Sequence, residues 1–316
     1  MRYGILFSGQ GAQRSGMGVE LMADSLFSRI VNQASEFSNL DLLKIMKNEH
    51  NELNKTQYVQ PALVTVSYGI FKMLKRDLPD FPIAGMMGLS LGEYAALLAS
   101  GALPFNEGIR LVTDRAKFMQ EDADKEDTTL AAILNPQISA IEELIQKEQK
   151  QGKRIYIANY NSPRQIVIGG SIPDVQEIVA KLQKENLAKK SVILKVNGAF
   201  HTPFFDGARQ KMHTRLQEVH FQKSQTPVIS NTINGPFTVN NLSMILERQL
   251  AVPTHFGDNL QYLVKNEKVN ATLEIGPGKT LTRFAHQVGH QLKESHIANL
   301  DDYEKFVKEQ QDGIKK

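Results

Sequence analysis

The stretch "IAGMMGLSLGEYAALLASG", residues 83–101, decides how this chain folds. Residues 83–87 form a short apolar run of strand length, and residues 91–100 have helical spacing before Gly101, a frequent helix end. Ser90 lies between Gly88 and Gly92, at the point where the strand turns into the helix. This G-x-S-x-G pattern is typical of a nucleophilic serine held on a strained turn, and an ordinary glycine-rich turn fits it as well.

A serine on such a turn has a defined chemical environment. The turn lifts the hydroxyl out of the sheet to a helix N-terminus, where the backbone N–H of Leu91 can face a developing oxyanion. A serine nucleophile also needs a base. His201, in "NGAFHTPFF", is the best candidate, although a histidine at the start of a helix can also serve only in packing or capping.

Composition excludes several classes of protein. The 316 residues are 41% hydrophobic and 22% charged, as expected of a soluble globular protein. The chain has no cysteine, which excludes disulfides, thiolate metal sites and a cysteine nucleophile. A net charge of +3 argues against a nucleic-acid-binding protein. No apolar run has the length of a membrane span or signal peptide, so we expect a cytoplasmic protein without a membrane partner.

The sequence also argues against metal and nucleotide sites. His286 and His290 stand four residues apart, but "HQVGH" lacks the glutamate of a zinc-binding HExxH motif, so we predict no metal site. The glycines near the N-terminus fail the dinucleotide-binding pattern, because Arg14 stands where the third glycine is required. We therefore expect no bound cofactor.

Strand and helix patterns predict an α/β fold. Residues 3–7, 83–87 and 271–275 look like buried strands separated by helices, which indicates a large subdomain with a mostly parallel sheet and a nucleophile elbow, as in α/β-hydrolases. We assign residues 1–125 and 196–316 to it. Residues 126–195 follow the order βαββαβ of an inserted, ferredoxin-like α+β subdomain. Helical spacing predicts a helix over 19–34, and the C-terminal stretch after 275 reads as helical and charged.

Several stretches together resemble a known family. They occur in that family's order and cover nearly the whole chain: "FSGQGAQRSGMG" at 7–18, "TQYVQPAL" at 56–63, "GLSLGEYAALLASGAL" at 88–103, "RAKFMQ" at 115–120, "ANYNSP" at 158–163, "GAFHTPFF" at 198–205 and "EIGPGKTL" at 274–281. With them the sequence resembles bacterial malonyl-CoA:acyl carrier protein transacylases and the acyltransferase domains of polyketide synthases.

The resemblance implies roles for particular residues. Ser90 would be the acylated nucleophile and His201 its general base and acid, with the backbone N–H groups of Gln10 and Leu91 as the oxyanion hole. Arg115 would bind the free carboxylate of the malonyl group. The remaining implied positions are Gln249, whose backbone carbonyl would orient the histidine, and the possible site-lining residues Gln60, Asn159, Asn161 and Phe200.

Two positions bear on substrate choice. Arg115 flanks the buried face of its helix and could equally be a solvated surface arginine; pointing inward, its planar cation would pair with a carboxylate and so favour malonyl over acetyl. Position 89 is leucine, where the family's elbow commonly has histidine. That histidine is not the base, so the departure leaves the pairing of Ser90 with His201 intact and bears only on a polar contact beside the nucleophile.

The resemblance also implies partners. These are malonyl-CoA and a phosphopantetheinylated acyl carrier protein, with the enzyme as a monomer. Residues 128–195 hold ten Lys or Arg and six Asp or Glu, an excess of 10 − 6 = +4, which would suit an acidic carrier protein, although solubilising surface charge explains most of it.

The expected reaction is ping-pong malonyl transfer through an ester on Ser90, for fatty acid biosynthesis. Three alternatives stay open at this point. One is a discrete acyltransferase of a polyketide pathway. Another is an α/β-hydrolase esterase or thioesterase, although no acid stands out between Ser90 and His201 to complete its triad order. The third is a non-catalytic subunit that binds the carrier protein.

Overall fold

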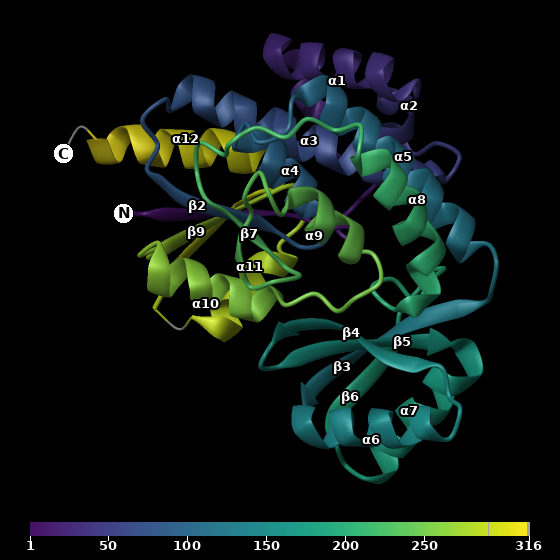
Figure 1. Cartoon of the computed structure of the whole chain (residues 1–316). Helices are drawn as coiled ribbons and strands as arrows, with labels where there is room; N and C mark the ends of the chain where they lie inside the picture. Colours follow the sequence, from purple (N-terminus) through teal and green to yellow (C-terminus); the bar gives the residue numbers. More distant parts are fainter. Residues whose placement is uncertain (290, 315–316) are drawn as a thin grey trace.

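The structure, a computed structural model, describes residues 1–289 and 291–314, so His290 lies outside the described residues. Its strands form two separate sheets, drawn in Figure 1 with the teal strands of the second sheet below the main body. The strands are β1 (Tyr3–Phe7), β2 (Ile83–Gly88), β3 (Thr128–Pro136), β4 (Ile155–Ser162), β5 (Gln165–Ser171), β6 (Ala188–Ile193), β7 (Val228–Ser230), β8 (Gly235–Pro236), β9 (Ala271–Ile275) and β10 (Lys293–Ile297). The α-helices are α1 (Ser25–Ser38), α2 (Leu42–Lys47), α3 (Thr56–Asp77), α4 (Gly92–Ala99), α5 (Phe105–Ala123), α6 (Ile138–Lys150), α7 (Ile172–Lys184), α8 (Asp206–Leu216), α9 (Leu242–Arg248), α10 (Phe256–Asn266), α11 (Thr280–Val288) and α12 (Leu300–Ile314), and short 3-10 turns are η1 (Glu20–Ala23), η2 (Glu52–Asn54) and η3 (Pro203–Phe205).

The first sheet has the order β10-β9-β1-β2-β7-β8 and is parallel except for the pairing of β7 with β8. Its central strands are apolar on both faces, as a sheet covered on both sides requires. Ile5 and Phe7 of β1 pack in one core with α1, α3, α4 and α5, whereas Leu6 packs in another with α10 and α11. The sheet therefore lies between two layers of helices, and the carboxyl ends of its central strands meet at one edge.

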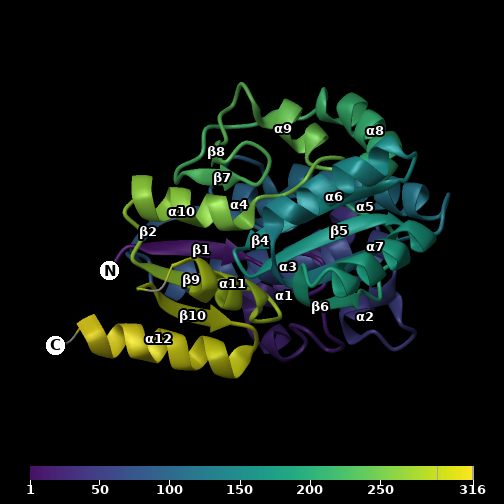
Figure 2. The same cartoon turned by 90° about the horizontal axis from the view of Figure 1, so that it is seen from below.

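The second sheet has the order β4-β5-β3-β6 with antiparallel neighbours. This is the strand order of a ferredoxin-like unit built as βαββαβ. Helices α6 and α7 cover its outer face (Figures 1 and 2), where Ala131, Ile133 and Ile168 form a separate core. Its other face turns toward the main body, because Leu130 and Val167 belong to the large core. The predicted fold class is confirmed, and we propose residues 126–195 as the inserted subdomain.

Two sequence expectations were wrong in detail. The helix expected over 19–34 starts at Ser25, because the Asp24 side chain accepts hydrogen bonds from the backbone N–H groups of Leu26 and Phe27 and so caps the helix there. The stretch after 275, expected to be helical, contains strand β10. Its residues are mostly polar because it is an edge strand that pairs on one side only, in parallel with β9.

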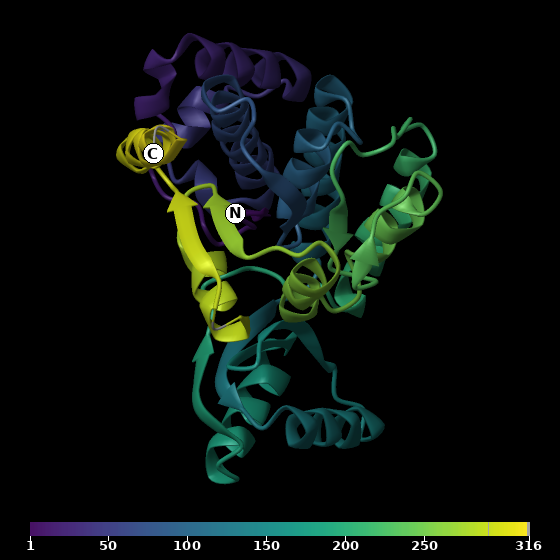
Figure 3. The same ribbon diagram turned by 90° about the vertical axis from the view of Figure 1, so that its left-hand side faces the viewer.

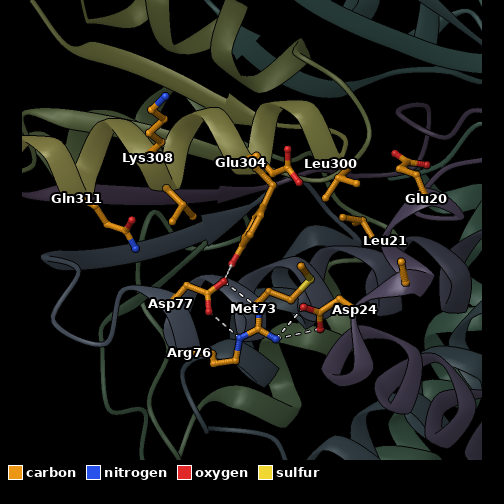
Figure 4. A pocket seen from close by; sticks show the side chains of 13 residues that line it. Glu20, Leu21, Asp24, Met73, Arg76, Asp77, Leu300, Glu304, Lys308 and Gln311 are labelled. Carbon is orange, nitrogen blue, oxygen red and sulfur yellow. Dashed lines mark hydrogen bonds and ion pairs between the residues drawn. The ribbon is translucent and has the colours of Figure 1, made fainter.

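Helix α12 lies along the β10 edge of the first sheet (Figures 2 and 3). A hollow of about 480 Å³ separates part of α12 from α3 and η1 (Figure 4). Beside it, Arg76 pairs with Asp24 and Asp77, and the Tyr303 hydroxyl of α12 donates to Asp77 at 2.5 Å. The bond between Tyr303 and Asp77 fastens the last helix to the end of α3.

Candidate active site

Ser90 stands on the turn between β2 and α4, and its backbone is in the left-handed region with φ of 51°. This conformation is uncommon for a residue with a side chain and is typical of functional turns. The flanking glycines are required by close approach. A Cβ on Gly88 would lie 2.0 Å from the carbonyl carbon of Gly92, and one on Gly92 would lie 2.1 Å from the carbonyl oxygen of Phe7. The turn is therefore a strained elbow. A loose glycine-rich loop would not require glycine at both positions.

Two residues that line the same cavity as the serine have free backbone N–H groups. Gln10, after β1, and Leu91, at the start of α4, both line it beside Ser90. Within the described ranges neither backbone N–H donates to an acceptor in the protein. Donors left free at the end of a strand and the start of a helix are suited to an oxyanion.

His201 is buried and lies in the loop between β6 and η3, with φ of 63°. Its Nδ1 lies 2.7 Å from the backbone carbonyl oxygen of Gln249, which can only accept, so Nδ1 carries the hydrogen and Nε2 keeps a free lone pair. Burial, aided by the nearby charge of Arg115 and opposed by the Gln249 carbonyl, lowers the pKa of His201 to about 4. The imidazole is thus a neutral base at physiological pH.

Arg115 of α5 is 1% exposed and points into the site. Its Nη2 donates to the Ser90 hydroxyl at 3.1 Å and to Gln249 Oε1 at 2.9 Å, and its Nη1 donates to Gln60 Oε1 at 2.6 Å. Its Nε is buried without a hydrogen-bond partner. No carboxylate in the described part of the chain forms a salt bridge with Arg115, so a buried cation faces the nucleophile without an anionic partner in contact.

The other expected lining residues divide into two groups. Phe200, Asn159 and Asn161 line the cavity, whose volume is about 760 Å³. Asn159 also donates to Thr254 Oγ1 at 2.6 Å, whereas the Asn161 side-chain oxygen is buried without a partner. Gln60 does not line the cavity; it lies behind it and bonds both Arg115 and the Gln10 side chain. The structure therefore brings every predicted site residue to one cleft or its immediate support.

Sequence reasoning missed two residues beneath the elbow, Glu93 and Asn231. The Asn231 side-chain oxygen accepts from the Ser90 backbone N–H at 2.9 Å. Glu93 is fully buried and accepts hydrogen bonds from the Asn231 backbone N–H and from Gln249 Nε2. Burial raises the pKa of Glu93, and those two bonds and Arg115 oppose the rise. Glu93 was visible as an acid on the apolar helix of the elbow, but Asn231 gave no sequence signal.

These features limit what the site can do. No group of three or more His, Cys, Asp or Glu side chains among the described residues could hold a metal ion. None of the helices the structure describes has the length and apolar character to cross a bilayer. A serine on a strained turn, a buried imidazole, free backbone donors and a buried cation in one cleft are the arrangement expected of an α/β acyltransferase with a serine nucleophile.

Comparison with known proteins identifies the family. Residues 5–312 match the model of the acyl transferase domain, and the chain belongs to that family. It is 34% identical to the malonyl CoA-acyl carrier protein transacylase of Bacillus subtilis, over 95% of this chain and 94% of the relative. It is 32% identical to the polyketide biosynthesis malonyl CoA-acyl carrier protein transacylase BaeC of Bacillus velezensis, over 92% of this chain and 98% of the relative. The crystal structure of MCAT from Streptococcus pneumoniae is 32% identical, with a TM-score of 0.91, and the match covers 98% of this chain and 100% of that one.

Proposed function

We propose that this acyltransferase moves the malonyl group of malonyl-CoA to the phosphopantetheine thiol of an acyl carrier protein, for fatty acid biosynthesis. The observation that carries the choice of acyl group is the buried guanidinium of Arg115, 3.1 Å from the Ser90 hydroxyl. A carboxylate is the natural partner of a desolvated guanidinium, and acetyl offers none. The relative from Bacillus velezensis, of similar identity to the one from Bacillus subtilis, is named for polyketide biosynthesis, so a polyketide pathway is the second candidate.

The first half-reaction forms an ester on the enzyme. His201 Nε2 removes the proton of the Ser90 hydroxyl as its oxygen attacks the thioester carbonyl of malonyl-CoA. The resulting oxyanion accepts from the backbone N–H groups of Gln10 and Leu91; removing one such donor in other enzymes costs about 3 kcal/mol of transition-state stabilisation. The carbon–sulfur bond then breaks, and CoA leaves with the proton from His201. The second half-reaction reverses these steps with the carrier thiol.

Arg115 also accounts for how the serine is held before the substrate binds. The Ser90 hydroxyl accepts from Arg115, and no hydrogen bond joins it to His201 in the part of the chain that the structure describes. A malonyl carboxylate is a stronger acceptor for the guanidinium than a hydroxyl is. We infer that the bound carboxylate replaces Ser90 on Arg115, and that the freed hydroxyl turns to His201.

We also propose that the enzyme is a cytoplasmic monomer that uses no metal or redox cofactor. Exchange of one thioester for another through an ester needs neither electron transfer nor a Lewis acid, because the free N–H groups and His201 supply charge stabilisation and proton transfer. The net charge of +3 supports the absence of a nucleic-acid partner. Size-exclusion chromatography with light scattering tests the monomer.

The decisive experiment traps the intermediate. The protein is incubated with malonyl-CoA, acetyl-CoA or methylmalonyl-CoA, and the adduct is mapped by mass spectrometry. We expect a malonyl ester on Ser90 that is passed to a holo carrier protein on addition. Fast hydrolysis without an acceptor would favour an esterase, and the absence of any adduct would favour a non-catalytic binding subunit.

A further inference from the structure

Glu93 occupies an unusual position for a carboxylate. It lies in the first turn of α4, directly beneath the nucleophile, and is 0% exposed. A buried carboxyl group is costly unless both oxygens are hydrogen-bonded. Oε1 accepts from the Asn231 backbone N–H, and Oε2 accepts from the Gln249 side chain. The two partners are the same residues that hold the elbow and the base.

Each partner leads to a different part of the machinery. Asn231 links Glu93 to the nucleophile turn: its backbone N–H donates to Glu93, and its side-chain oxygen accepts from the Ser90 backbone N–H at 2.9 Å. Gln249 Nε2 donates to the Ser90 carbonyl oxygen at 3.0 Å as well as to Glu93. The backbone carbonyl of Gln249 holds His201 Nδ1. Hydrogen bonds therefore connect the buried carboxylate of Glu93 to the Ser90 turn through Asn231 and to His201 through Gln249.

The carboxylate also fixes the polarity of the Gln249 amide. That amide lies between two groups of opposite hydrogen-bonding character: Arg115, which can only donate, and Glu93, which accepts. The nitrogen must face Glu93 so that the oxygen can face Arg115. An amide at position 93 would present a donor either to Gln249 or to the Asn231 N–H. In the first case Gln249 would turn over and oppose Arg115 with its own N–H groups.

From this arrangement we propose that Glu93 is a positioning residue for malonyl selectivity: it orients the Gln249 amide, and through that amide it orients the guanidinium of Arg115 beside Ser90. The proposal rests on the proposed function, because it concerns how the carboxylate-binding cation is held. It predicts that a change at position 93 alters the preference for malonyl over acetyl, and not only the overall rate.

The test compares acylation of Ser90 from malonyl-CoA and from acetyl-CoA in wild type and Glu93→Gln, by rapid quench and mass spectrometry. We expect the malonyl-to-acetyl ratio of kcat/KM to fall by about tenfold or more in Glu93→Gln, as when a buried donor loses its acceptor. Glu148→Gln is the matched control. Glu148 is a carboxylate 3% exposed that pairs with Lys153 and Lys181 in the second sheet's helical layer, and its loss should leave the ratio unchanged.

A double variant separates positioning from general loss of structure. In Gln249→Ala the amide that links Glu93 to Arg115 is removed, while the backbone carbonyl that holds His201 stays. We expect Glu93→Gln/Gln249→Ala to have the same malonyl-to-acetyl ratio as Gln249→Ala alone, because Glu93 acts on Arg115 through that amide. If Glu93 only supports the fold, the two changes will add or the ratio will stay at the wild-type value in all variants, and either result overturns the proposal.

The outcomes also keep the two proposals apart. A wild-type protein that forms no malonyl ester on Ser90 would contradict the proposed function itself. A wild-type protein that forms the ester, with Glu93→Gln folded by circular dichroism and unchanged in its malonyl-to-acetyl ratio, would contradict only the role of Glu93. Should Glu93→Gln fail to fold, Gln249→Ala tests the same link from its other end: the proposal requires it to lower the malonyl-to-acetyl ratio, and an unchanged ratio would overturn the proposal.

Discussion

The guanidinium of Arg115, in helix α5, donates a hydrogen bond at 3.1 Å to the hydroxyl of Ser90, which stands on the turn before α4. Helix α5 brings Arg115 against the elbow at the start of α4, and the arginine stacks over the ring of Tyr94 at 5.3 Å from the ring centroid. Nucleophile and cation are thus held by the packing of two neighbouring helices. The chemistry of the acyl group follows from this relationship, and it can be tested by changing either residue.

Replacing Arg115 should change which acyl group is accepted. In Arg115→Ala we expect kcat/KM for malonyl-CoA to fall by about 10²–10³-fold, because a buried charged hydrogen bond of roughly 3–4 kcal/mol is lost. Acetyl loading should fall far less. Arg115→Lys keeps the charge but not the planar fork, so it should recover only part of the malonyl activity. An unchanged malonyl preference in Arg115→Ala would remove this residue from the substrate site.

Ser90→Ala should abolish the covalent intermediate. The hydroxyl is the group that Arg115, Leu91 and Gln10 surround, so its removal leaves no oxygen to carry the acyl group. Intact-mass measurement after incubation with malonyl-CoA should show no adduct. Ser100→Ala, at the buried serine that directly follows α4 as its C-cap, is the control and should keep the adduct. A malonyl ester that persists in Ser90→Ala would contradict the assignment.

Much of this site could be predicted from the sequence because it depends on local steric rules. Gly88 and Gly92 stand where any side chain would collide with the backbone, so the motif records the geometry of the turn directly. His201 was the best candidate base from its own stretch of sequence, but only the resemblance favoured catalysis over packing or capping, since nothing local connects residues 90 and 201. Asn231 was missed because an asparagine after a strand is common, and its role depends on the pairing of β7 beside β2.

The fold shows the same limit. The central strands β1 and β2 are short apolar runs, as burial on both faces favours, and β9 adds the buried polar residues Thr272 and Glu274 to an otherwise apolar run. Strand β10 has the sequence KESHI, which reads as polar and helical because one side of it faces solvent. It becomes a strand only because β9 offers it an open edge. Edge strands are set by tertiary pairing, so local patterns predict them poorly.

Acid should inactivate the enzyme only well below neutral pH. Burial depresses the pKa of His201 to about 4, so the imidazole is neutral and able to act as base above that value. We expect kcat/KM for acetyl-CoA loading to show no acid limb near pH 6.5 from His201 and to fall as the pH drops through about 4. Acetyl-CoA is the substrate of choice because it has no carboxyl group that titrates in the same range. An acid limb near pH 6.5, the ordinary histidine value, would show that His201 is not shielded as the structure indicates.

The same shift has a consequence for stability. His201 has a lower pKa in the folded protein than in the unfolded chain, so the unfolded chain binds the proton more readily. Its contribution to the free energy of unfolding is complete above pH 6.5 and is lost as the pH falls from 6.5 to about 4. Denaturant titrations of wild type and His201→Gln over this interval should converge toward acid pH. A difference that is independent of pH would contradict the depressed pKa.

Gly92→Ala should destabilise the protein because the elbow has no room for a methyl group. The added Cβ would lie 2.1 Å from the carbonyl oxygen of Phe7, in the backbone of strand β1, which cannot move without breaking its pairing with β2. We expect the free energy of unfolding to fall by about 2–3 kcal/mol, in the upper range for overpacked sites. Gly235→Ala is the matched control, since its nearest neighbour would be 3.8 Å away and its substitution should be close to neutral. The strained turn, and with it the exposure of the Ser90 hydroxyl, depends on tight contact between β1 and α4. Equal stability of the two variants in urea would mean that this contact is absent.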